Sequence, residues 1–113
     1  MVNPCAGEVE IRLNGQAHVA KLTLGSLAEL ESAMPDGSFV DLVERFEGGS
    51  FSPRDVLAII LAGLRGAGWT GSEAELVKTQ IGDGPMEAAR LAGQLLVRAF
   101  SPQNALGGAS DED

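Results

Sequence analysis

Few side chains in this chain could perform covalent or acid–base chemistry. It contains one cysteine, Cys5, one histidine, His18, and no tyrosine. A catalytic nucleophile needs a neighbouring base, and a zinc site needs several His, Cys or carboxylate ligands at suitable spacing. His18 has no second histidine and no nearby cysteine at such a spacing. The sequence therefore predicts a packed or edge-exposed imidazole at His18, with no metal site and no catalytic residues.

Two further patterns resemble functional motifs without completing them. Glu8 and Glu10 alternate with apolar residues, as the charged residues on the solvated face of a strand do. The glycine-rich segments 66–68 and 82–84 lack the lysine of a phosphate-binding loop, so we interpret them as helix ends. We expect a protein that acts by binding, with no enzyme activity and no cofactor.

Three residues are the predicted partner-binding residues: Trp69, Phe51 and Arg65. Trp69 is the single tryptophan and follows a predicted helix on a glycine-rich bend. That position suits either an exposed anchor for a partner or a lid on the protein's own core. Phe51 precedes the same helix and Arg65 lies near its end. The alternative that Trp69 and Phe51 only cover the core stays open.

The longest apolar run predicts the helix around which the other elements pack. Ser52 is a suitable N-cap, Pro53 suits the first helical position, and the glycines at 66 and 68 end the helix. The apolar residues between positions 56 and 64 cover more than one stripe of a helix, which predicts a central, buried helix. The run is far shorter than the roughly 20 residues of a membrane span. We expect Leu61 to be fully buried, so that Leu61→Ala costs about 2–5 kcal/mol.

The N-terminal part of the chain predicts a β-hairpin. Residues 7–13 alternate apolar and charged side chains, and Asn14-Gly15 is a strong signal for a type I′ turn. A return strand over residues 16–23 would place Ile11 opposite His18, Val9 opposite Ala20 and Glu8 opposite Lys21.

The rest of the sequence predicts helices. Apolar stripes indicate helices at 24–34, 39–47 and 86–100, and Ser72 with Glu75 forms a capping box that opens a helix at 73–80. The fold class is therefore α+β, mainly α, with an N-terminal β-hairpin packed on a bundle of about five helices. We predict a single domain over residues 7–100 and a disordered acidic tail at 101–113.

The charge of the chain restricts its partners. Sixteen acidic and eight basic side chains give a formal net charge of −8. That charge repels phosphate backbones and anionic lipid surfaces, so we expect neither nucleic acid nor a membrane as a partner. One cysteine cannot form an internal disulfide, and no signal sequence opens the chain, which predicts a cytoplasmic location.

Three segments together resemble a known family: EVEIRLNGQ running into KLTLGSLAELE, then SPRDVLAIILAGLRGAG, then LAGQLLVRAF. They are similar to the small tail-assembly protein of gene transfer agents and siphophage-like tails, which is labelled either tail tube protein or tail assembly chaperone. The resemblance covers residues 8–100. It implies a mainly helical, non-enzymatic protein that binds the tape-measure protein and aids polymerisation of the tail tube subunits. A structural tail tube component and a small cytoplasmic adaptor domain are the alternatives.

The first testable prediction concerns the C-terminal residues. Residues 101–113 have almost no apolar content, so they have little to offset the entropy lost on ordering. A chain ending at Phe100 should therefore melt at nearly the same temperature as the full chain. A clear fall in melting temperature, measured by circular dichroism, would contradict the prediction.

Overall fold

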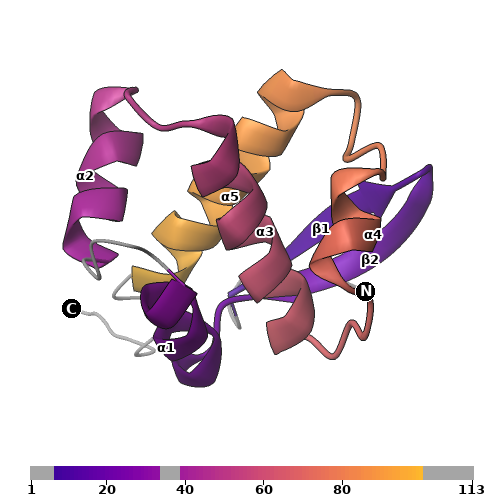
Figure 1. The fold of residues 1–113 in the computed structure, drawn as a ribbon, viewed down its shortest axis with the longest axis horizontal. Helices are drawn as coiled ribbons and strands as arrows, with labels where there is room; N and C mark the ends of the chain where they lie inside the picture. The colour runs from indigo at the N-terminus through magenta and orange to yellow at the C-terminus, as the bar shows by residue number, and fades with distance from the viewer. Residues whose placement is uncertain (1–6, 34–38, 101–113) are drawn as a thin grey trace, which may run out of the picture.

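A computed structural model of the chain describes residues 7–33 and 39–100 (Figure 1). The elements follow in the order β1 (Glu8–Leu13), β2 (Gln16–Lys21), α1 (Leu24–Ala33), α2 (Phe39–Gly48), α3 (Pro53–Gly66), α4 (Glu73–Val77) and α5 (Pro85–Phe100). The predicted fold class, a hairpin with five helices, is confirmed. The predicted acidic tail, residues 101–113, and the predicted end of the first helix at Met34 lie outside the described residues.

Helix α3 lies in the middle of the molecule, with α5 and the hairpin on one side and α1 at its C-terminal end (Figure 1). Its start is fixed by a complete capping box. The Ser52 hydroxyl accepts a hydrogen bond from the Asp55 amide at 3.2 Å, and the Asp55 carboxylate accepts one from the Ser52 amide at 2.9 Å. The predicted N-cap and central position are thus confirmed.

The expectation that Leu61 is fully buried was wrong. Ile59, Ile60 and Leu64 are fully buried, whereas Leu61 is only partly buried. Leu61 lies on one helical stripe with the exposed Arg54 and Arg65, seven residues before it and four after it. That stripe is the surface side of α3, so the apolar run extends beyond the part of the helix that the other elements cover.

Two glycines let the neighbouring elements approach α3 closely. A Cβ atom at Gly63 would lie 2.9 Å from Leu95 on α5 and 3.3 Å from Ala20 on β2. A Cβ atom at Gly66 would collide with the Lys21 carbonyl oxygen. Small residues at these positions therefore serve internal packing.

The hairpin has the predicted register. Ile11 pairs with His18, Val9 with Ala20, and Glu8 with Lys21. Asn14 and Gly15 both have positive φ, at 53° and 85°, as a type I′ turn requires. Val9, Ile11, Leu13 and Ala20 form the buried face.

The segment that follows α4 ties the hairpin to the helices. The Asn14 amide donates to the Gln80 carbonyl at 2.9 Å, the Gln80 amide donates to the Asn14 side chain at 3.0 Å, and the Gly82 amide donates to the Arg12 carbonyl at 2.8 Å. The predicted helix at 73–80 was too long, because Gln80 is recruited by the hairpin and α4 ends at Val77.

Helix α2 is joined to the start of α3 by one ion pair and one aromatic stack. Arg45 donates two hydrogen bonds to Asp55, at 2.9 and 3.0 Å, and the rings of Phe46 and Phe51 stack with centroids 4.5 Å apart. The Arg45 guanidinium lowers the pKa of Asp55; partial burial opposes this shift, and hydrogen bonds from Ser52 add to it. Asp55 therefore serves both the N-cap of α3 and the attachment of α2.

The second prediction uses the burial pattern of α3. Leu64→Ala should lower the free energy of unfolding by about 2–5 kcal/mol, because Leu64 is fully buried and the substitution leaves a cavity. Leu61→Ala, the same substitution on the surface stripe, should cost clearly less. Urea unfolding of both variants measures the two losses. Equal losses would show that the burial of α3 is misassigned.

The third prediction concerns pH. Folding lowers the pKa of the Asp55 carboxyl group below its unfolded value of about 3.9. The group therefore stabilises the fold at pH values above about 3.9, and this stabilisation is lost as the pH falls through the folded pKa. Asp55→Asn should therefore destabilise the protein by about 1 kcal/mol at neutral pH, and the difference from wild type should shrink in acid. The matched control is Glu44→Gln, which removes the same charge from an exposed position on α2. An Asp55→Asn deficit that is unchanged between neutral and acid pH would contradict the assignment.

Candidate functional site

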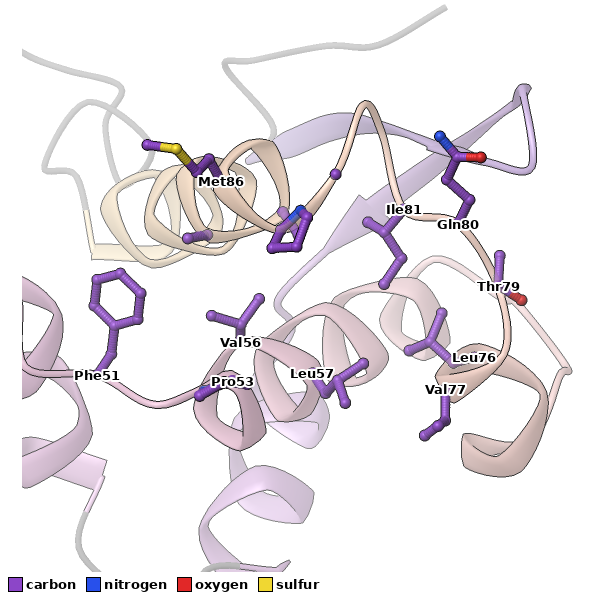
Figure 2. Close-up of a pocket in the computed structure, with 14 residues that line it drawn as sticks. Phe51, Pro53, Val56, Leu57, Leu76, Val77, Thr79, Gln80, Ile81 and Met86 are labelled. Carbon is purple, nitrogen blue, oxygen red and sulfur yellow. The ribbon is translucent and has the colours of Figure 1, made fainter.

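An apolar groove of about 660 Å³ lies between the start of α3, the short helix α4 and the start of α5 (Figure 2). Its walls are almost entirely carbon: Phe51, Pro53, Val56, Leu57, Leu76, Val77, Ile81, Pro85, Met86, Ala88 and Ala89. Only Thr79 and Gln80 add polar side chains. An apolar concavity of this kind suits a binding site for apolar groups of another molecule.

The groove exists because α4 is too short to cover α3. Helix α4 has five residues, and the chain then turns away to bond to the hairpin at Gln80 and Gly82. Gly82 and Gly84 have positive φ, which brings the chain to Pro85, where α5 begins. The side of α3 around Leu57 is consequently left partly uncovered.

Two apolar side chains on the rim of the groove are open to solvent. Met86 on α5 is 88% exposed and Val77 on α4 is 58% exposed. Figure 2 shows them on different sides of the groove, with Val56 and Leu57 between them. Burying both side chains under a partner would remove apolar surface from water, which favours association.

The three predicted partner-binding residues do not gather in one place. Phe51 lines the groove, where its ring stacks on Phe46. Trp69 and Arg65 lie at the other end of α3, a helix of 14 residues and hence about 20 Å long. The structure therefore brings one of the three to the groove.

Trp69 and Arg65 have different surroundings. The Trp69 side chain is partly buried and packs on the core, with its ring so close to Gly71 that a Cβ atom there would collide with it. Arg65 is exposed and lines a smaller, polar cavity with Ser26 and Glu29. Partner binding by these residues stays a prediction.

Sequence reasoning missed Met86 and Val77. Met86 lies outside the apolar stripe that α5 buries, which includes Ala88, Leu91 and Leu95. An apolar residue outside the buried stripe of its own helix is the signal that could have found it.

A second, polar cavity of about 460 Å³ lies between β1 and α5. Its three arginines already have partners: Arg12 lies 3.7 Å from Glu10, Arg90 lies 3.0 Å from Glu87, and Arg98 donates to the Glu8 carbonyl. Glu10, Asp83 and Glu87 also line the cavity, so three carboxylates balance its three arginines and it offers no concentrated positive charge.

Across residues 7–33 and 39–100, no three His, Cys, Asp or Glu side chains come together in a way that would hold a metal ion. None of the helices in these residues is long and apolar enough to cross a membrane.

Comparison with known proteins gives a family assignment. A family model described as "Phage tail tube protein, GTA-gp10" matches residues 6–102, which is most of the chain. No curated protein and no solved structure gave a significant match. The match agrees with the resemblance of the three sequence segments to tail-assembly proteins. The chain belongs to the family of phage tail tube proteins related to GTA-gp10.

Proposed function

We propose that the protein is a non-enzymatic tail assembly chaperone of a gene transfer agent or prophage. In this function it binds the tape-measure protein and helps the tail tube subunits to polymerise around it. It acts in the bacterial cytoplasm while particles assemble. The family assignment supports a function in a phage-like tail, and the chaperone function is the step beyond it.

The observation that carries the proposal is the apolar groove. Its rim leaves Met86 and Val77 exposed in a chain whose net charge of −8 otherwise favours solubility. Exposed apolar surface beside a concavity indicates a site for another protein. A chaperone needs such a surface to hold a partner before the particle is complete.

A structural tail tube component is the second candidate, and the description of the family favours it. Subunits that form a ring or tube contact each other through two different, complementary surfaces on each copy. A net charge of −8 on every copy opposes close packing of copies at low salt. This charge supports the chaperone over the tube subunit.

The fourth prediction separates the two candidates. When co-expressed with the tape-measure protein and the tail tube subunit from the same tail gene cluster, the chaperone should co-purify with the tape-measure protein. Quantitative mass spectrometry of purified particles should find it absent or far below the level of the tube subunit. The tube subunit is the matched control in both measurements.

Many copies in the mature particle, at the level of a ring-forming subunit, would show a tube component instead. Failure to bind either tail protein, with all three proteins folded, would contradict the chaperone function.

A further inference from the structure

We propose that the apolar groove binds an amphipathic α-helix of the partner, with basic residues flanking the apolar face of that helix. The inference rests on the proposed function only in taking a tail protein as the source of the helix. Beyond the proposed function, it specifies that the bound segment of the partner is helical and basic, and that this segment contacts Met86 and Val77.

The walls of the groove favour a helix over an extended strand. An extended segment has backbone N–H and C=O groups that must find partners when buried. Three helices form most of the walls, and their own backbone groups are largely bonded within each helix. A helical segment satisfies its own backbone and can bury apolar side chains in such a groove.

The connector between α4 and α5 already uses backbone groups of Gln80, Gly82 and Gly84 in hydrogen bonds. The backbone groups of Gln80 and the Gly82 amide are bonded to the hairpin, and the Gly84 amide donates to the Ile81 carbonyl at 3.2 Å. A strand added to this segment would have to displace these bonds. The helix needs no such displacement.

The size of the groove suits several side chains from one helical face. A volume of about 660 Å³ is within the range of sites that hold a ligand much larger than a single side chain. Apolar residues at i, i+3, i+4 and i+7 of a helix form a continuous stripe that could lie along Val56 and Leu57, between Met86 and Val77.

Charge favours a basic partner over a second copy of this chain. The whole chain carries −8, and no charged side chain lines the groove. Next to its lining segments the acidic Glu73, Glu75 and Asp83 stand against the basic Arg54 and Lys78, while Glu87 and Arg90 pair with each other. A second copy of the chain would itself carry a net charge of −8. The chain's own last residues, Asp111, Glu112 and Asp113, are acidic too. A helix with lysine or arginine beside its apolar stripe is the complementary occupant.

The fifth prediction uses a synthetic probe on the full chain. The probe is a leucine–lysine peptide of about 18 residues, or five helical turns, with leucine at the helical period. A control peptide has the same composition with leucine at alternate positions, which is the period of a strand. By fluorescence anisotropy at physiological salt, the helical-period peptide should bind at least about tenfold more tightly, a difference of about 1.4 kcal/mol. Equal binding of the two peptides would overturn the inference that the groove takes a helix.

Two matched pairs of variants locate the contact. Met86→Glu should weaken binding of the helical-period peptide about tenfold or more, whereas Leu24→Glu should leave it unchanged. Met86 and Leu24 are 88% and 84% exposed, both lie in the first turn of a helix, and both variants add one negative charge. Val77→Thr should weaken binding about fourfold by loss of one buried methyl group, with Val97→Thr unchanged as its control.

Urea unfolding checks that all four variants are folded. If Met86→Glu does not fold, Val77→Thr and its control Val97→Thr still test the inference. Equal binding by the groove variants and their controls would place the peptide elsewhere and overturn the proposal. The proposal would also be overturned if the wild-type chain formed dimers that Met86→Glu abolished and Leu24→Glu did not. The groove would then bind a second copy of the chain. Tighter peptide binding by a chain ending at Phe100 would assign the groove to the chain's own last residues.

The same variants distinguish failure of this inference from failure of the proposed function. If the tape-measure protein binds wild type and Met86→Glu equally, the function stands and the groove is not its site. If the helical-period peptide binds as predicted but the tape-measure protein does not bind at all, the helix-binding groove stands and the proposed partner is wrong.

Discussion

The fold depends on covering helix α3 on as many sides as possible. Its apolar residues extend around more of the helix than one neighbour can bury, so the hairpin, α1, α4 and α5 each cover part of it. Gly63 and Gly66 permit close contacts with β2, α5 and α1. At the other end, Asp55 caps α3 and also holds α2 through Arg45. At the start of α3, one carboxylate therefore both caps the helix and holds a neighbouring helix in place.

The candidate site follows from incomplete coverage of the same helix. The chain after α4 bonds to the hairpin turn, which helps to stabilise a two-stranded sheet that would be marginal alone. That contact ends α4 after five residues and leaves the groove beside Leu57 open. The bonds that fix the hairpin thus also shape the surface through which we propose that the protein binds its partner.

Local signals predicted the elements well because each depends on neighbouring residues. Asn14-Gly15 fixed the hairpin register, and Ser52 and Ser72 marked the helix starts, since turns and capping boxes are formed within a few residues. The errors were long-range in origin. The Gln80 contact with Asn14 spans 66 positions and shortened α4, and the burial of Leu61 depended on which side of α3 its neighbours cover. The groove joins three helices, so Met86 and Val77 could not be placed together without the fold.

Methyl resonances of methionine offer the most direct test of the groove as the partner site. The chain has three methionines, Met1, Met34 and Met86, and Met86 lies on the rim of the groove. With ¹³C-methyl-methionine protein, addition of the tape-measure protein should shift or broaden the Met86 signal. Saturating binding that leaves the Met86 signal unchanged would contradict the proposal that the partner is held in this groove.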